Sequence, residues 1–341
     1  MTTIRRVRAA ASLLAGAAAL AFLAPGDDYA GGVASFSPGP SGDTFGDDAL
    51  GPPTGAGLFS GSFDATTLGV SGSITLALST PAGNGAGTDL IVCENPFLLL
   101  SDPSTSFAEV CTVEVSSDNQ TFVRFPMKYT GPVGPFIPTQ GAALTWYSGL
   151  AGVRPVLTSV PLGPKPLDVV HAGGDAFDLA DLANTPQVLA GDVDLGQIRY
   201  VRLTDIDTGT VVDDFGTAIW DCGLDSSSSA DIDAVIAVNS QGNQAPGRPW
   251  VDLSLDSAGF LTLHVFDPDG LKDVKQGLDA AIDMTPVPFF ALLPFFALTQ
   301  VDTFSFTMVT GPVPPGVYPV ELRVGTIDKT GLFGGDALRL P

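Results

Sequence analysis

Hydrophobic and polar residues alternate with a period of two in short runs along most of the chain. Glycine, proline, asparagine and aspartate bound these runs, and such a pattern is typical of strands that bury one face. Helical periodicity is confined to a turn or two near Ala180–Ala183. The clearest runs are Gly72–Leu78, Leu90–Cys93, Ala108–Ser116, Phe122–Phe125, Ile198–Thr204, Ile232–Val238, Val251–Leu255, Gly259–Phe266, Asp302–Val309 and Val317–Val324. The pattern predicts an all-β fold of antiparallel sheets.

A polar segment rich in glycine and proline interrupts this pattern at Asn239–Pro249. Such a composition is typical of a linker, and the alternation restarts after it. We therefore expect a first β-sandwich over residues 31–240 and a smaller one over residues 246–341. The tight turn Ser116-Ser117-Asp118-Asn119 predicts a hairpin, because asparagine tolerates a positive φ, and Phe122 is expected to return to the core.

The first thirty residues read as an export signal. Three arginines precede Ala9–Ala24, an uninterrupted run of small apolar residues, and Pro25-Gly26 ends it. This order predicts a signal peptide over residues 1–30, cleaved after Ala21 or after Ala30. A retained membrane anchor is the alternative, although 16 residues are short for a span. The sequence thus predicts a secreted or cell-surface protein with no transmembrane segment in its mature part.

The excess of acidic residues excludes one class of function. The 341 residues carry 37 acids against 15 lysines and arginines, a net charge of −22, and only four of the acids are glutamate. A chain this acidic does not bind nucleic acid through release of counterions. Aspartate, glycine and proline are poor helix formers, which agrees with the all-β pattern.

Several phrases resemble a known fold. The strand Tyr200-Val201-Arg202-Leu203 and the hairpin at residues 113–122 resemble the discoidin-like, galactose-binding-like jelly roll. A series of five phrases resembles a family of secreted bacterial cell-surface proteins: residues 50–53, 72–76, 94–97, 177–182 and 231–235. The segment 315–331 resembles the last hairpin of bacterial immunoglobulin- or cadherin-like modules. The resemblance implies a jelly-roll β-sandwich followed by an immunoglobulin-like β-sandwich.

Acidic residues at strand ends and in loops are the candidate metal ligands. Carboxylates that follow apolar residues on a core-facing side must be paired, hydrogen-bonded or bound to a cation, and Ca²⁺ suits irregular loops rich in oxygen. The jelly-roll resemblance implies a structural Ca²⁺ as well. We expect the ligands among Glu94, Asp178, Asp181, Asp205, Asp214, Asp221, Asp231 and Asp233. The alternative is that these acids cap turns through hydrogen bonds to backbone amides.

Three cysteines complete the candidate chemistry. Export places them in an oxidising compartment. Cys93 and Cys111 each lie in a predicted strand with a loop between, so neighbouring antiparallel strands would bring them together as a disulfide. Cys222 is then left free. The only two histidines, His171 and His264, lie in different predicted sandwiches, which disfavours a nucleophile paired with histidine.

These features predict an exported, non-catalytic cell-surface protein for adhesion or ligand binding, with loops ordered by Ca²⁺. The partner is a surface glycan or a protein. Trp146-Tyr147 and Trp220 could form a platform on which a sugar stacks, or plug the core. Two alternatives stay open: an extracellular hydrolase that acts on polysaccharide through paired aspartates, and a purely structural component of the envelope.

Overall fold

The computed structural model describes residues 28–134, 141–157, 169–222, 229–240, 248–268, 274–283, 285–288, 296–301, 305–312, 321–328 and 333–339. The predicted signal peptide therefore lies outside the described residues, except for its last three positions. No helix in the described parts of the chain is long and apolar enough to cross a membrane.

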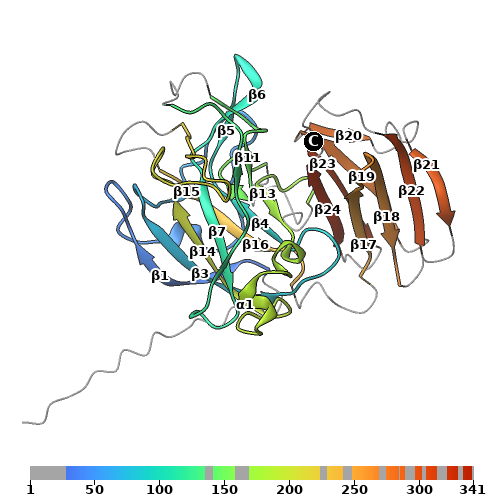
Figure 1. The fold of residues 1–341 in the computed structure, drawn as a ribbon, viewed down its shortest axis with the longest axis horizontal. Coiled ribbons are helices and arrows are strands. Elements are labelled where there is room, and N and C mark those ends of the chain that lie inside the picture. The colour runs from blue at the N-terminus through green and yellow to red at the C-terminus, as the bar shows by residue number, and fades with distance from the viewer. Residues whose placement is uncertain are drawn as a thin grey trace, which may run out of the picture.

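The protein is all-β, as the alternation predicts, and its sheets are antiparallel (Figure 1). The strands up to residue 240 are β1 Ala30–Ser37, β2 Thr66–Thr67, β3 Ser73–Ala82, β4 Leu90–Cys93, β5 Phe97–Leu99, β6 Asp102–Phe107, β7 Cys111–Ser116, β8 Val123–Arg124, β9 Lys128–Tyr129, β10 Ala142–Ala143, β11 Tyr147–Ser148, β12 Leu150–Ala151, β13 Asp175–Phe177, β14 Ile198–Asp205, β15 Asp231–Ile232 and β16 Ala234–Ala237.

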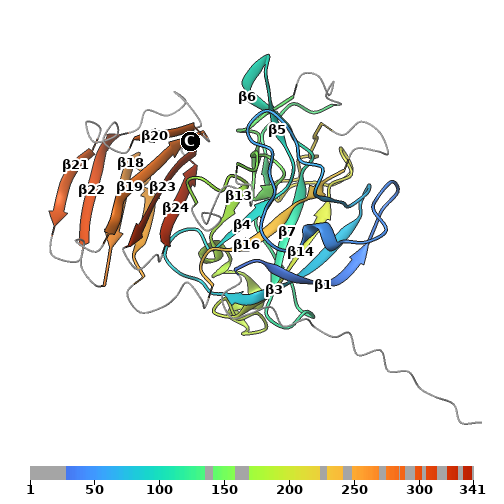
Figure 2. The same cartoon turned by 180° about the vertical axis from the view of Figure 1, so that it is seen from behind.

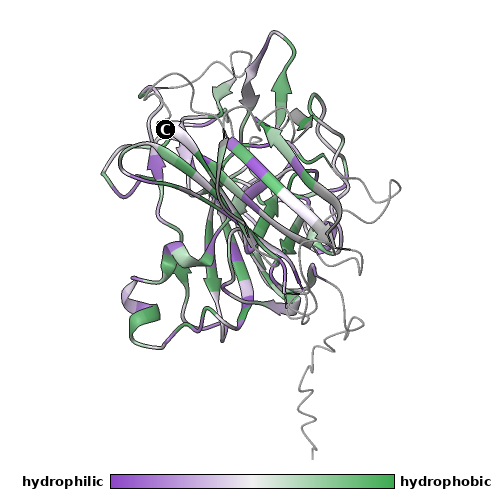
Figure 3. Cartoon of the chain, turned by 90° about the vertical axis from the view of Figure 1, so that its right-hand side faces the viewer, coloured by the Kyte–Doolittle hydropathy of each residue, from purple (hydrophilic) through white to green (hydrophobic). Residues whose placement is uncertain are grey.

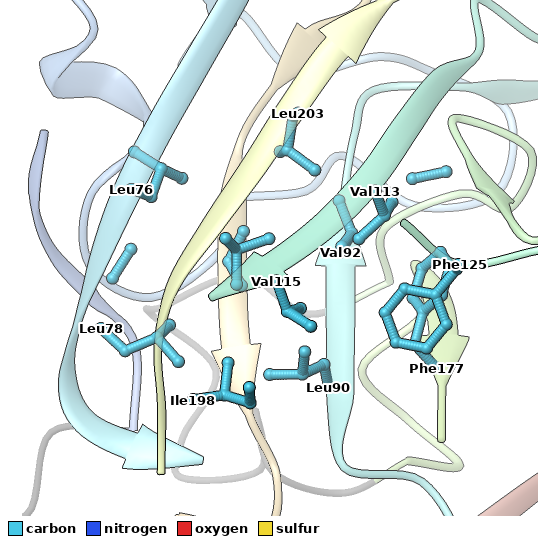
Figure 4. Packing of buried hydrophobic residues seen from close by; sticks show 14 of the residues in the cluster. Leu76, Leu78, Leu90, Val92, Val113, Val115, Phe125, Phe177, Ile198 and Leu203 are labelled. Atoms are coloured by element: carbon cyan, nitrogen blue, oxygen red, sulfur yellow. The ribbon is translucent and has the colours of Figure 1, made fainter. Parts of the chain in front are cut away.

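Two of these sheets pack face to face. One has the order β1-β3-β14-β7-β12, with β8 paired to β7, and the other has the order β13-β4-β16. Register places Leu203 opposite Val113 and Val201 opposite Val115, so their side chains share the inner face. Leu90 and Val92 of β4 fill the core from the other side (Figure 4). Smaller sheets, β10-β6-β5, β11-β9 and β15-β2, lie around this sandwich.

The strands after residue 249 form two four-stranded sheets. Their orders are β17-β18-β22-β21 and β20-β19-β23-β24. Val251, Leu263 and Val324 are buried in a separate hydrophobic core between them. The strands are β17 Trp250–Leu255, β18 Phe260–Phe266, β19 Val274–Ile282, β20 Thr285–Pro288, β21 Phe296–Val301, β22 Ser305–Pro312, β23 Glu321–Asp328 and β24 Phe333–Arg339. Apolar and polar residues alternate along the strands, as Figure 3 shows.

Among the described residues, helix is confined to short pieces. These are the 3₁₀ turns η1 Asp47–Ala49 and η4 Leu179–Leu182, and the single α-helical turn α1 Pro186–Leu189. Pro186 opens α1 at a position where its missing N–H costs nothing. Asp178 caps η4 by accepting a hydrogen bond from the Ala180 N–H at 2.7 Å. This cap fixes the start of η4, and with it the positions of Asp178 and Asp181.

Candidate ligand-binding cleft

A cleft of about 470 Å³ lies where the β23–β24 edge meets the first sandwich. One wall comes from residues 125–128, β11, β13 and η4, and the other from Glu321 and from Ala337–Arg339 of β24. The two walls therefore come from the middle and the last part of the sequence, and Figure 2 shows β24 beside β13 and β4. A volume of this size is typical of a site for a small ligand.

Aromatic rings supply the apolar surface of the cleft. Phe125 and Phe177 are both buried and form a tilted pair with ring centroids 4.8 Å apart. Phe215 also lines the cleft but is 75% exposed. The Lys128 ammonium lies 5.7 Å from the centre of the Phe215 ring, which is within the range of a cation–π contact. The cleft thus has a buried aromatic floor and an open aromatic rim.

Buried ion pairs join the two walls. The Arg154 guanidinium lies 3.1 Å from Asp175 and 2.8 Å from Glu321, and Arg323 lies 2.6 Å from the same glutamate. Burial acts to raise the pKa of Glu321, but the two guanidinium groups outweigh it and hold the pKa below its usual value. Glu321 therefore stays ionised and anchors β23 to the first sandwich.

Arg323 extends this network into the loop before β13. Its side chain is completely buried and donates hydrogen bonds to the carbonyl oxygens of Val169, Gly173 and Gly174, at 3.0, 3.1 and 2.6 Å. Arg339 likewise donates to the Thr145 and Tyr147 carbonyls. Both walls are fixed by hydrogen bonds, so the cleft is preformed.

Two carboxylates face the cleft from η4. Asp178 and Asp181 are three residues apart, which places them on the same side of a 3₁₀ turn. Burial raises the pKa of Asp178 to about 7, against the hydrogen bond from Ala180, and neighbouring Asp89 and Asp336 raise it further. Burial also raises the pKa of Asp181. One oxygen of Asp178 is used by the Ala180 amide, and its second oxygen is left to accept from a ligand.

Asp214, the third carboxylate in the cleft, has a lowered pKa rather than a raised one. Asp214 forms an ion pair with Arg124, and it accepts a hydrogen bond from the Met127 N–H at 2.6 Å. Burial acts to raise the pKa of Asp214, but these donors outweigh it and lower the pKa. Asp214 is therefore ionised at neutral pH, whereas Asp178 titrates there.

Most of the predicted metal ligands bond backbone amides instead. The Asp205 carboxylate accepts from the Ser71 and Ala230 amides, both at 2.9 Å. Asp233 accepts from the Thr54 amide at 2.9 and 3.0 Å, and Asp221 from the Val110 amide at 3.2 Å. Asp231 accepts from the Thr67 hydroxyl at 2.5 Å. These acids connect segments that are far apart in the sequence, rather than capping their own turns.

Glu94 is the exception among these acids. It is buried, and its Oε1 accepts from the Asp231 amide at 2.8 Å, whereas its Oε2 has no hydrogen-bond partner among the described residues. Burial, followed by repulsion from Asp231 and Glu109, raises its pKa well above the usual value. A buried carboxyl with acidic neighbours is stable in its protonated form.

The predicted calcium ligands do not gather into one group of side chains within the described residues. In the part of the chain that the structure describes, no three His, Cys, Asp or Glu side chains are grouped so that they could hold a metal. Of the eight predicted ligands, three line the cleft: Asp178, Asp181 and Asp214. Ca²⁺ binding therefore stays a prediction from the sequence.

The predicted disulfide between Cys93 and Cys111 is wrong. All three cysteines are buried and free. β4 pairs with β13 and β16, whereas β7 pairs with β14, β12 and β8, so the two strands are not neighbours. Cys111 faces the core between the sheets, while Cys93 packs with Ile91 on the opposite face of its own sheet. Cys222 is free, as predicted.

The two tryptophans for which a sugar platform or a place in the core was expected do not line the cleft. Trp146 and Trp220 pack against the hydrophobic cluster around Tyr129 and Tyr147. Tyr147 lines the cleft but is 1% exposed, and its hydroxyl donates to the Trp220 carbonyl at 2.7 Å. The exposed ring of the cleft is Phe215, which sequence reasoning missed because the Asp213-Asp214-Phe215-Gly216 turn gives no periodic pattern.

Comparison of the chain with family models, curated proteins and solved structures finds no match.

Proposed function

We propose that this protein is an exported, non-catalytic cell-surface protein that binds a carbohydrate ligand in the cleft between its two sandwiches. The observation that carries the proposal is the pairing of an open aromatic ring, Phe215, with the carboxylates of Asp178 and Asp181 in one preformed cleft. An aromatic face packs against the C–H face of a sugar, and carboxylate oxygens accept hydrogen bonds from its hydroxyls.

The charged side chains of the cleft determine which glycans are expected to bind. Arg154 is neutralised by Asp175 and Glu321, and Asp214 by Arg124. The carboxylates of Asp178 and Asp181 have no basic partner within ion-pair distance among the described residues. Five acids and three bases line the cleft when Lys128 and Arg339 are counted, so the lining has an excess of carboxylates. A neutral or amino-bearing glycan satisfies them, whereas a uronate or a sulfated glycan meets like charge.

The arrangement also supports an active role for the second sandwich. Glu321, Leu338 and Arg339 line the cleft, so β23 and β24 contribute directly to the site. This contribution favours ligand binding over a spacer role. A jelly roll over residues 31–240 and an immunoglobulin-like module over residues 246–341 remain part of the proposal, supported by the two pairs of packed antiparallel sheets.

Replacing Phe215 with alanine should weaken glycan binding about tenfold, because stacking against an exposed ring contributes about 1 kcal/mol or more. Asp181→Asn should weaken it by a similar factor through loss of a charge-assisted hydrogen bond. The measurement is an array of neutral, amino-bearing and acidic glycans, followed by calorimetry with the best neutral oligosaccharide.

Phe63→Ala is the matched control, because Phe63 is a fully exposed phenylalanine outside the cleft lining. It should leave affinity unchanged. Equal loss in Phe63→Ala and Phe215→Ala, or no glycan bound at all, would contradict the proposal.

Hydrolysis by paired aspartates is the second candidate, and one observation favours it. Asp178 and Asp214 line the same cleft with pKa values displaced in opposite directions, as in sites that divide acid and base roles between two carboxyls. Release of reducing ends from a bound polysaccharide, abolished in both Asp178→Asn and Asp214→Asn, would replace the non-catalytic proposal with this one.

A further inference from the structure

Asp28, Tyr29 and Ala30 lie inside the predicted signal peptide, yet they are part of the folded sandwich. The Asp28 carbonyl accepts a hydrogen bond from the Ala237 N–H at 2.7 Å. Tyr29 forms an antiparallel bridge with Ile236 of β16. Ala30 begins β1 and pairs with Leu78 of β3.

These three residues connect the two sheets of the first sandwich. β16 is the edge strand of the three-stranded sheet, and β1 is the edge strand of the larger sheet. The chain therefore crosses from one edge to the other within Tyr29–Ala30, and it closes that side of the core. Figure 2 shows β16, β3 and β1 in the first sandwich.

The crossing is buried and hydrogen-bonded. Ala30 is fully buried within the main core and Asp28 is 9% exposed. The Tyr29 carbonyl accepts from the Ser79 N–H and the Ala30 carbonyl from the Gly51 N–H, both at 2.9 Å. The Ser240 hydroxyl donates to the Asp28 carboxylate. Loss of residues 28–30 would remove three backbone acceptors and uncover the edge of the core, which is costly.

The two candidate cleavage positions differ in whether the mature chain keeps residues 28–30. Cleavage after Ala30 would discard the whole crossing, whereas cleavage after Ala21 retains it. The residues before the cut also favour cleavage after Ala21. Small residues occupy the first and third positions before an Ala21 cut, namely Ala21 and Ala19, whereas the third position before an Ala30 cut is the charged Asp28.

We infer that the export signal is removed between Ala21 and Phe22, so that Asp28–Ala30 remain in the mature protein as the start of its first sandwich. The site is a processing site for a peptidase that requires small residues on its amino-terminal side. The inference rests on the export that forms part of the proposed function, and it is independent of the ligand.

The test is to produce the full chain in a bacterial host and to determine the amino terminus of the exported protein by mass spectrometry. We expect a mature chain that begins at Phe22. A chain that begins at Gly31, or at any other residue, would overturn the inference. A chain that keeps Met1 in the membrane fraction would overturn export itself, so the two failures are distinguishable.

A variant pair sharpens this test. Ala21→Leu in the full chain should block processing and leave the precursor, because leucine does not fit the position next to the cut. Ala24→Leu is the matched control, since it makes the same substitution three residues beyond the cut and should be processed normally. Normal processing of Ala21→Leu, with an unchanged amino terminus, would overturn the assignment.

Discussion

Replacing Arg323 with alanine should lower the free energy of unfolding by about 3–5 kcal/mol, the range expected when one partner of a buried ion pair is removed. The Arg323 side chain is completely buried, and it bonds Glu321 and the carbonyls of Val169, Gly173 and Gly174. Its loss removes this donor from the three carbonyls, leaves Glu321 with Arg154 as its remaining ion-pair partner, and opens a cavity. Urea unfolding of the variant and of the wild-type protein measures the difference.

Arg199→Ala is the control for this substitution. Arg199 is exposed, and its side chain donates a hydrogen bond to that of Gln197 at 2.9 Å. Its replacement should change stability by no more than about 0.5 kcal/mol. If Arg323→Ala behaved like Arg199→Ala, the buried network would not be what holds β23 and β24 against the first sandwich, and the preformed cleft would lose its support.

Most strands could be predicted from the sequence because apolar and polar residues alternate wherever one face of a sheet is buried and the other is exposed to solvent. β7 follows this rule, with Val113 and Val115 in the core and Glu114 on the outer face. The hairpin at Asn119 is confirmed, since its φ is 63°. Phe122 was expected in the core but stacks on Arg202, with the guanidinium carbon 3.8 Å from the ring centre. Strand ends were less predictable, because β3 continues to Ala82 beyond the predicted end at Leu78.

The candidate site lay beyond sequence reasoning for two physical reasons. β4 is buried on both faces, so its sequence gives no sign that Cys93 points away from Cys111. The cleft joins residues such as Lys128, Asp178 and Arg339, which are far apart in the chain and belong to no shared motif. The acid-rich loops are recognisable in the sequence. The backbone N–H groups that donate hydrogen bonds to their carboxylates belong to distant segments, so no local sequence pattern identifies them.

Acidification from pH 8 to pH 5 should stabilise the protein. Burial raises the pKa of Asp89, Asp205 and Asp336 from 3.8 to about 6 in the folded protein. A carboxyl whose pKa is higher when folded stabilises the fold fully below about pH 4, and this contribution is lost as pH rises through the folded value. A rise from 3.8 to about 6 corresponds to about 3 kcal/mol for one group. The melting temperature should therefore be several degrees higher at pH 5 than at pH 8, about 2–4 °C per kcal/mol.

Asp178→Asn isolates one group in this pH dependence. Asparagine keeps an oxygen that accepts from the Ala180 amide, so the cap of η4 is retained while the titrating carboxyl is lost. The variant should match the wild-type protein at pH 5, where Asp178 is protonated, and it should melt at a higher temperature at pH 8, because the pKa of Asp178 is about 7. Below pH 4 the trend reverses, since Asp214 and Glu321 have lowered pKa values and lose their ion pairs on protonation. Thermal unfolding from pH 3 to pH 9 should thus give a maximum between about pH 4 and pH 6. A maximum at or above pH 7 would show that the buried carboxyls are held ionised by donors stronger than their burial.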